Sequence, residues 1–260
     1  MAIDEAIFRV SQRSNTLPTL RLYGWTCPSV SLGYFQEVHR EIDVIACRRH
    51  DIPVVRRPTG GKAVLHDTEV TYAVVAKEKN PLFSADLMET YRVIARCIAD
   101  GLARLGMEAH MADDGRSPHA DSLSSSCFAT PARHELLVNN RKICGSAQVR
   151  SRGAFLQHGT ILMAFDPLKT CDVMLSHSGD YVKQVERLKR SVTSVIEHAG
   201  PSAAVGAVCG SLRKGFEKTL DIELIPGILS PEEETLAAHL MTHKYMNERW
   251  NMKGGCRSWM

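Results

Sequence analysis

Two stretches of the sequence combine residue types that can bind and activate a carbonyl or phosphate group. The first is Arg56-Arg-Pro-Thr-Gly-Gly-Lys-Ala-Val-Leu-His-Asp67, which carries two guanidinium groups, two adjacent glycines, a lysine and a histidine. Adjacent glycines let a backbone approach a ligand closely, and arginine donates paired hydrogen bonds. The same residues also suit a glycine turn beside solvated arginines, because the stretch fits neither the P-loop nor the dinucleotide-binding pattern.

The second stretch offers a nucleophile and a cation. Cys127 lies in Ser-Ser-Ser-Cys-Phe-Ala-Thr-Pro, and Lys142 follows fifteen residues later in Asn-Asn-Arg-Lys-Ile-Cys-Gly-Ser-Ala-Gln. The thiolate is the reactive form of cysteine, and a nearby ammonium favours it. A loop and a hairpin turn at Asn-Asn are long enough to bring the two side chains together. On spacing alone, a surface lysine and an incidental cysteine remain the commoner arrangement.

These residues must be positioned by short strands and a few helices. Apolar residues at helical spacing predict helices over 2–13, near 40–50 and over 84–105, with Ser84 as N-cap of the last, and Ser230-Pro-Glu-Glu begins a helix running to about Asn247. β-Branched and alternating stretches predict strands at 20–22, 30–32, 53–57, 69–76, 134–138, 142–149 and 155–165. The interleaving predicts a single α+β (α/β) domain rather than a repeating βαβ series.

One stretch has the composition of a mobile surface loop. From Asp113 to Ser126 the apolar residues almost vanish, and Ser, Asp, Gly and Pro dominate. Structureless loops of this length inside a domain are uncommon and tend to be lids or binding loops. Since Cys127 follows at once, we expect its thiol to be accessible.

Composition excludes several classes of protein. The chain has 260 residues, 44% hydrophobic and 23% charged, with a formal net charge of +3, so neither disorder nor a general nucleic-acid surface is indicated. No apolar stretch approaches the length of a membrane span, and the first residues lack the apolar core of a signal peptide. Eight cysteines without a CxxC pair predict free thiols rather than a metal site. We therefore expect a cytoplasmic protein.

Five pieces of the chain, in order, resemble one family. RRPTGGKAVLHD, SCFATP, ELLVNNRKICGSAQ, FLQHGTIL and KYMNERWN are similar to the catalytic domain of biotin/lipoate protein ligases. The resemblance implies mixed β-sheets flanked by helices in one domain over 1–250, with 251–260 as a tail. The chain looks short of the family's usual N-terminal strand, and Lys62 and Cys144 replace residues more usual there.

Within the family, the SCF cysteine and the RKICGSAQ lysine resemble octanoyltransferases that form a cysteine acyl-enzyme. This implies catalysis by Cys127 and Lys142 in lipoate biosynthesis. The donor would be octanoyl acyl carrier protein, and the acceptor a lysine of a lipoyl domain or of the glycine-cleavage H protein, with neither ATP nor a metal and with a monomeric enzyme. The implied substrate-binding residues are Arg57, Gly60, Gly61, His66, Gly145, Ser146, Ala147, His158 and Gly159.

Three other activities fit the same motifs. A lipoate ligase would activate free lipoate with ATP and would not depend on Cys127. An amidotransferase would move octanoyl from the H protein to other lipoyl domains, also through a cysteine. A relative that handles carriers without turnover is the third alternative. The ligases commonly carry a further C-terminal domain, and ten residues follow Trp250 in this sequence.

The chemistry assigns provisional roles to these residues. The ammonium of Lys142 is expected to activate Cys127. Once the thiolate is acylated, Lys142 loses its anionic partner and can release a proton, and the neutral amine is then the best candidate base for the acceptor lysine. His66 and His158 are the alternative bases. The oxyanion would meet backbone N–H groups of either the Gly60-Gly61 or the Gly145-Ser146 turn.

Two broader expectations concern the acyl chain and the acidic partners. Val64, Tyr72 and Leu162 are candidates to line an apolar acyl tunnel, although each also suits an ordinary core position. A basic face that includes Arg56, Arg57 or Arg141 would speed encounter with acidic carrier proteins and lipoyl domains.

Overall fold

A computed structural model of the chain describes residues 1–112, 135–175 and 180–253. The predicted loop at 113–126 and the candidate nucleophile Cys127 lie outside the described residues. Within the described ranges, no helix combines the length and the apolar character needed to cross a membrane.

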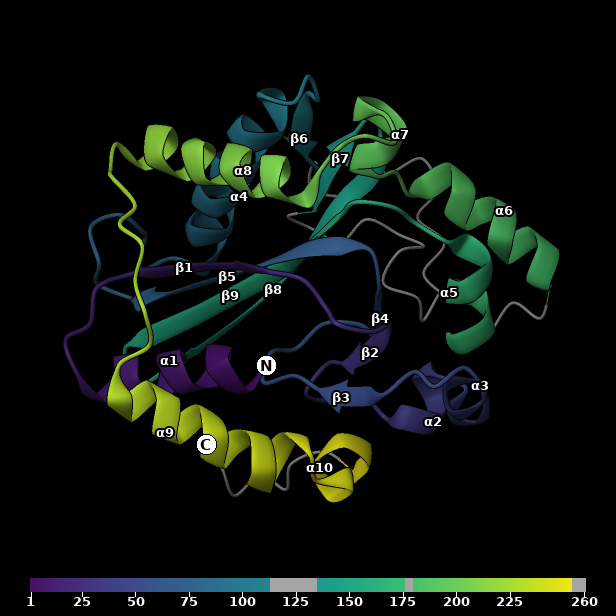
Figure 1. Cartoon of the computed structure of the whole chain (residues 1–260), viewed down its shortest axis with the longest axis horizontal. Helices are drawn as coiled ribbons and strands as arrows, with labels where there is room; N and C mark the ends of the chain where they lie inside the picture. Colours follow the sequence, from purple (N-terminus) through teal and green to yellow (C-terminus); the bar gives the residue numbers. More distant parts are fainter. Residues whose placement is uncertain (113–134, 176–179, 254–260) are drawn as a thin grey trace.

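A six-stranded antiparallel sheet forms the centre of the molecule (Figure 1). Its strand order is β1-β5-β9-β8-β7-β6. The β8–β9 hairpin turns at Arg152 and Gly153, and the β7–β8 hairpin turns at Asn139 and Asn140, as the Asn-Asn pair predicted. The strands are β1 Thr19–Tyr23, β5 Glu69–Lys77, β6 Ala109–Met111, β7 Leu136–Val138, β8 Arg141–Ser151 and β9 Ala154–Leu162.

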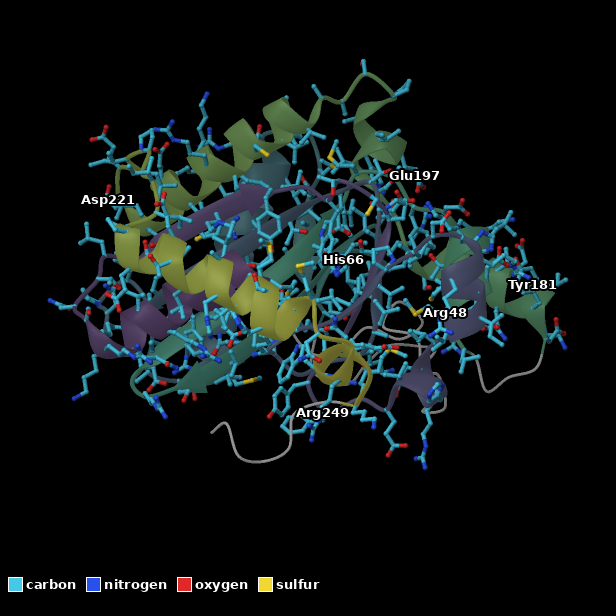
Figure 2. The ribbon with its side chains drawn as sticks, turned by 60° about the horizontal axis from the view of Figure 1, so that its bottom comes forward. Arg48, His66, Tyr181, Glu197, Asp221 and Arg249 are labelled. Carbon is cyan, nitrogen blue, oxygen red and sulfur yellow. The ribbon has the colours of Figure 1, made fainter. Side chains whose placement is uncertain are left out.

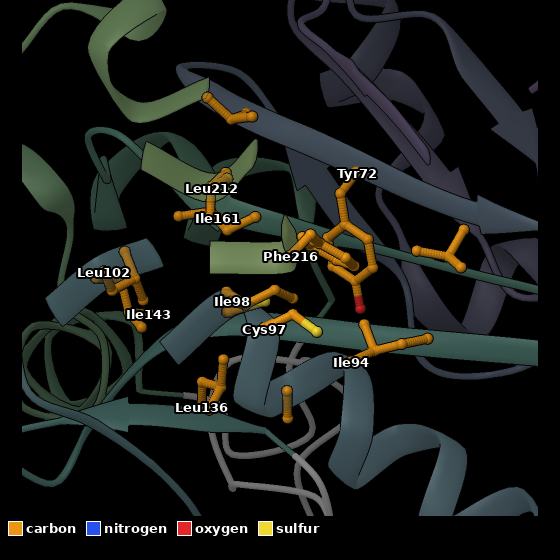
Figure 3. Packing of buried hydrophobic residues seen from close by; sticks show 14 of the residues in the cluster. Tyr72, Ile94, Cys97, Ile98, Leu102, Leu136, Ile143, Ile161, Leu212 and Phe216 are labelled. Atoms are coloured by element: carbon orange, nitrogen blue, oxygen red, sulfur yellow. The ribbon is translucent and has the colours of Figure 1, made fainter. Parts of the chain in front are cut away.

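Helices cover both faces of this sheet. α4 (Leu87–Ala103) and α8 (Val205–Leu220) pack on one face, and α1 (Ala2–Arg13) with α9 (Pro231–Leu240) on the other (Figure 1). Side chains alternate along β5, so that Tyr72 faces α4 and α8 while Ala73 faces α1. Figure 3 shows the first of these cores, where the Tyr72 ring lies near Ile94 and Cys97 of α4. The two layers bury the sheet on both sides.

A second, three-stranded sheet of order β3-β2-β4 lies beside the large one. β2 runs parallel to β3 and antiparallel to β4. Its apolar residues form a separate core with α3 and α5. The remaining elements are β2 Ser29–Leu32, β3 Val54–Arg56, β4 Val64–His66, α2 Val38–Glu41, α3 Val44–Arg49, α5 Pro167–Val173, α6 Tyr181–Ser191, α7 Val195–Ala199, the π-helix η1 Met241–Tyr245 and α10 Glu248–Lys253.

The α+β class predicted from the sequence is confirmed, with differences in detail. The helix expected near 40–50 is two short helices, α2 and α3. α4 begins after Asp86, whose carboxylate caps the N–H of Glu89, and Ser84 instead accepts from the N–H of Asp86. The capping box at Ser230 is present as predicted. α10 runs three residues past the boundary expected at 250.

Candidate active site

A cavity of about 540 Å³, its open mouth included, is lined by residues of both sheets. His66 of β4 lies on its wall, and Figure 2 shows His66 in the interior of the molecule, far from the peripheral Arg48 and Tyr181. The structure brings nine of the predicted site residues to this cavity: Arg57, Gly61, His66, Lys142, Gly145, Ser146, Ala147, His158 and Gly159. Gly60 precedes Gly61 in the same loop, and Cys127 lies outside the described residues.

Gly159 makes room for a hydrogen bond that crosses three strands. It pairs with Tyr72 of β5 on one side and with Ser146 of β8 on the other. The Tyr72 hydroxyl lies 2.6 Å from Oγ of Ser146. A Cβ atom on Gly159 would lie 2.6 Å from Cε1 of Tyr72 and 2.9 Å from that Oγ. A side chain at this position would therefore disrupt the wall of the cavity.

Lys142 is almost completely buried, with 1% of its side chain exposed, and reaches the cavity wall from the start of β8. Its ammonium forms an ion pair with the carboxylate of Glu135, which is 6% exposed. A Cβ atom on Gly145 would lie 3.1 Å from Nζ of Lys142. Glycine at 145 therefore provides the space that the lysine tip occupies.

Arg57 holds the glycine loop in shape. Its Nη2 donates to the carbonyl oxygens of Gly60 (2.9 Å) and Lys62 (2.7 Å), and its Nη1 donates to the carbonyl of Ser31 (3.1 Å). Gly61 has a φ of +92°, a conformation that favours glycine. The guanidinium of Arg57 thus fixes the loop that borders the cavity.

The prediction of a basic docking face is wrong for Arg56 and Arg57. Arg56 and Arg57 are 1% and 5% exposed, because both are bonded to backbone carbonyls. Nη1 of Arg56 donates to the carbonyls of Gly33 and Gln36, both at 2.8 Å. Arg141 is partly exposed, but it is paired with Glu197. Arg56 and Arg57 therefore shape loops and are not available to an acidic surface.

His66 sits between a hydroxyl and a carboxylate. Its Nε2 lies 2.7 Å from Oγ of Ser31, and its Nδ1 lies 2.7 Å from Oε1 of Glu69. The Trp25 ring stacks on the imidazole at 4.2 Å, and all three polar residues are buried. A carboxylate on one ring nitrogen sets the orientation of the other. The arrangement presents His66 to the cavity in a single orientation.

His158 is a neutral histidine. Burial lowers its pKa to about 3, so it carries no proton charge near neutral pH. Its Nε2 lies 2.7 Å from Oγ1 of Thr59, while its buried Nδ1 has no hydrogen-bond partner among the described residues. His158 is one of the residues that line the cavity. The low pKa disfavours His158 as a general base.

Cys144 is not placed to act as a nucleophile. It packs in the apolar core, and burial raises the pKa of its thiol to about 12. Among the described residues, Cys27 is the exposed thiol, and it does not line the cavity. Nothing in the described part of the chain thus competes with Cys127 for the role that the sequence assigns to it.

The three residues considered as the lining of an acyl tunnel occupy different places in the structure. Val64 lines the cavity. Tyr72 is wholly buried in the core between the sheet and α4, with its hydroxyl hydrogen-bonded to Ser146 across the sheet. Leu162 packs against Leu188 and Val192. Tyr72 and Leu162 are therefore core residues, as their sequence context equally allowed.

Residues 1–217 match the family described as the lipoyl protein ligase A/B catalytic domain. The chain belongs to this family. The octanoyltransferase LipM of Kyrpidia tusciae is 41% identical over 260 residues, which cover 97% of this chain and 93% of that protein. The octanoyltransferase LipM of Bacillus subtilis is 38% identical over 258 residues, with the same two coverages.

Solved structures of lipoate protein ligases have the same fold. A putative lipoate protein ligase of T. acidophilum with bound lipoic acid superposes with a TM-score of 0.80 at 27% identity, over 97% of this chain and 92% of that one. A lipoate-protein ligase A bound with ATP gives a TM-score of 0.80 at 28% identity, over 96% and 92%. The predicted catalytic-domain fold is confirmed.

Sequence reasoning missed three polar residues of this lipoyl protein ligase A/B catalytic domain. Ser31 and Glu69 hold His66, and Glu135 holds Lys142. Glu69 and Glu135 are each a lone carboxylate at the start of an apolar strand, Glu-Val-Thr-Tyr and Glu-Leu-Leu-Val. Because buried carboxylates are rare unless paired, this pattern is a signal that could have found both. Ser31 offers no comparable signal.

Proposed function

We propose that this protein is an octanoyltransferase of protein lipoylation, which passes an octanoyl group from a carrier thioester to a lysine through a thioester on Cys127. The observation that carries the proposal is the identity of up to 41% with octanoyltransferases named LipM over 97% of the chain. The cavity supports it, because the buried Lys142, Gly61 of the glycine loop and the neutral His158 line one space.

In the first half of the reaction, the Cys127 thiolate attacks the carbonyl carbon of the donor thioester. A new C–S bond forms to Cys127, the C–S bond to the carrier breaks, and the carrier leaves as a thiolate that takes up a proton. A free cysteine has a pKa of about 8.5, so a positive charge beside it raises the thiolate fraction at neutral pH. The ammonium of Lys142 is the group on the cavity wall that we assign to this role.

The backbone N–H groups of the glycine loop are the best candidates to stabilise the oxyanion that forms in this step. In the described part of the chain, the N–H groups of Gly60 and Gly61 donate to no protein acceptor. Gly145 and Ser146 belong to the β8–β9 ladder and do not form the turn expected from the sequence. Preorganised donors of this kind typically contribute about 3–4 kcal/mol to such reactions. We therefore assign the oxyanion site to Gly60 and Gly61.

In the second half, the amine of the acceptor lysine attacks the thioester on Cys127. The C–S bond breaks, the sulfur leaves as a thiolate, and the nitrogen releases its surplus protons to a base. The acceptor ammonium has a pKa of about 10.4, so it must lose one proton before it attacks. Of the three candidate bases, the low pKa disfavours His158, which leaves Lys142 and His66.

The proposed partners are octanoyl acyl carrier protein as donor and a lipoyl domain or the glycine-cleavage H protein as acceptor, in the cytoplasm. These proteins meet the chemical requirement for a donor thioester and an acceptor amine. We propose further that the reaction needs neither ATP nor a metal. The thioester is already activated, and its transfer to an amine is downhill.

The second candidate is an ATP-dependent lipoate ligase, favoured by the likeness to a ligase structure bound with ATP. An amidotransferase that takes octanoyl from the H protein differs from our proposal only in its donor. The three activities differ in donor, in ATP use and in their dependence on Cys127.

Incubation of the purified protein with octanoyl acyl carrier protein and an apo lipoyl domain, without ATP, tests the proposal. We expect intact mass to show one octanoyl group on the lipoyl domain. With the donor alone, the enzyme should gain one octanoyl group that neutral hydroxylamine removes, and peptide mapping should place it on Cys127. Transfer that requires ATP and free acid would instead support the lipoate ligase. Transfer that starts only from octanoyl H protein would support the amidotransferase.

A further inference from the structure

The ion pair between Lys142 and Glu135 is one of the most buried charged contacts in the described part of the chain. The two side chains are 1% and 6% exposed. Both backbones are anchored beside the pair: the N–H of Thr193 donates to the carbonyl of Lys142 at 2.9 Å, and the N–H of Ala112 donates to the carbonyl of Glu135 at 2.9 Å. The pair is therefore a fixed element of the cavity wall.

We propose that Glu135 is a positioning residue for acyl transfer, which keeps Lys142 in its ammonium form and directs it at the cavity through both halves of the reaction. The inference rests on the proposed octanoyl transfer and names a residue that the motifs did not include. Glu135 acts through Lys142 and does not itself line the cavity.

The surroundings of Lys142 explain why its charge needs a permanent partner. Burial favours the neutral amine of a lysine. Two further cationic residues, Arg57 and Lys62, line the same cavity and disfavour a third cation, and His66 and His158 also line it. The carboxylate of Glu69, on β5, is bonded to His66 of β4. Among the described residues, Glu135 places its carboxylate in contact with the Lys142 ammonium.

A permanent carboxylate changes the part that Lys142 plays in the second half-reaction. Without Glu135, acylation of the thiolate would remove the anion beside Lys142 and release its proton. With Glu135 in contact, the ammonium keeps an anionic partner after acylation. Lys142 then acts as a fixed positive charge at the cavity, which favours each anion that forms during the reaction. The acceptor proton goes to another group, and His66 is the remaining candidate base on the wall.

The position of the ammonium is as restricted as its charge. A Cβ atom on Gly145 would lie 3.0 Å from Cε of Lys142 and 3.9 Å from Oε1 of Glu135. The lysine tip therefore lies between the β8 backbone and the carboxylate. A neutral amide in place of the carboxylate keeps the shape of this space but removes the attraction that fixes the ammonium in it.

The test compares Glu135→Gln, Glu135→Asp and a matched control, Glu5→Gln. Glu5 is also a buried carboxylate, 4% exposed, and accepts from Nζ of Lys244 at 2.7 and 2.8 Å, but it does not line the cavity. We expect Glu135→Gln to lower kcat of octanoyl transfer about 100-fold with KM for the donor changed less than about threefold. Glu135→Asp should recover about tenfold of that loss, and Glu5→Gln should leave kcat within about twofold while lowering Tm.

A spectroscopic readout separates this inference from the proposed function. In lysine side-chain ¹⁵N spectra, the Lys142 signal, assigned by its loss in Lys142→Arg, should have the character of an ammonium at pH 8 in the wild type. In folded Glu135→Gln it should have the character of an amine. An ammonium signal that persists in Glu135→Gln, or kcat within about threefold of wild type, overturns the inference. A wild-type enzyme without ATP-independent transfer would instead refute the proposed function, whatever the spectra show.

Discussion

Replacing Gly145 by alanine should separate catalysis from folding. The added Cβ atom would lie 3.0 Å from Cε and 3.1 Å from Nζ of Lys142. Non-bonded carbon atoms prefer separations of about 3.5–4.0 Å, so the lysine tip must withdraw by about 0.5–1 Å. Because this tip is the flexible end of a side chain, it can move without displacing the strand. The ammonium would then leave the place in which Glu135 holds it.

The size of both effects follows from these distances. Misplacing a reacting group by about 1 Å can cost about 100-fold in rate, which corresponds to about 2.7 kcal/mol. Crowding of a packed site costs about 1–3 kcal/mol of stability, and alanine in a strand regains about 0.5–1 kcal/mol relative to glycine. A domain with a typical stability of about 5–15 kcal/mol therefore stays folded. The loss of activity would reflect the position of Lys142 and not unfolding.

The assay is single-turnover acylation by octanoyl acyl carrier protein, followed by intact mass. Gly210→Ala is the control, since a Cβ atom on Gly210 of α8 meets no atom within 4 Å. That variant should acylate at the wild-type rate with a Tm equal to or above wild type, because alanine is the better helix former. If folded Gly145→Ala acylates within about threefold of wild type, the position of the Lys142 ammonium does not control the reaction.

Three further outcomes follow from the site. Cys127→Ala should lose ATP-independent transfer in the intact-mass assay while its circular dichroism stays unchanged. The pKa of His158 is about 3 when folded and about 6.5 when unfolded. The unfolded chain therefore takes up the proton first as pH falls, and urea unfolding should show stability declining below pH 6.5 by up to about 1.4 kcal/mol per pH unit, a decline that His158→Gln should reduce. Since burial raises the pKa of Cys144 to about 12, iodoacetamide at pH 8 should label exposed Cys27 and leave Cys144 unlabelled in peptide maps of the native protein.

Much of the fold was predictable because its signals are local. The apolar spacing of 2–13, the capping box at Ser230 and the Asn-Asn turn each specify a structure through contacts within a few residues. The start of α4 was misplaced for a related reason, since Ser84 and Asp86 are both capable caps and the sequence does not rank them.

The sequence does not show that both arginines of the first motif bond to backbone carbonyls, which belong to Gly33 and Gln36 for Arg56 and to the nearby Gly60 and Lys62 for Arg57. Arg56 accepts a bond at its carbonyl from Nε1 of Trp250, and its N–H donates to Oδ1 of Asn251. No local pattern distinguishes such an arginine from a solvated one, since the segment after β2 and the packing of α10 against β3 supply the acceptors. The guanidinium groups of these arginines do form hydrogen bonds, but their partners are backbone carbonyls of this chain and not the carboxylates of an acidic protein.

The composition of the cavity wall depends on the strand register, which is set by two short turns flanking β8 and by a register shift between Leu136 and Leu137 of β7. Asn139 and Asn140 have φ values of 50° and 60°, and Arg152 and Gly153 have values of 50° and 73°, so each hairpin is closed by two residues at positive φ. Two-residue loops of this kind fix which residues face each other across the ladder. A slip of one residue would turn every side chain of β8 to the opposite face. Gly159 lies beside Ser146 in the register that follows the Arg152-Gly153 turn. On the other side of β8, Leu137 lies opposite Lys142, and the register shift next to Leu137 pairs Leu136 with Cys144, so the meeting of Glu135 with Lys142 depends on this irregularity as well as on the turn.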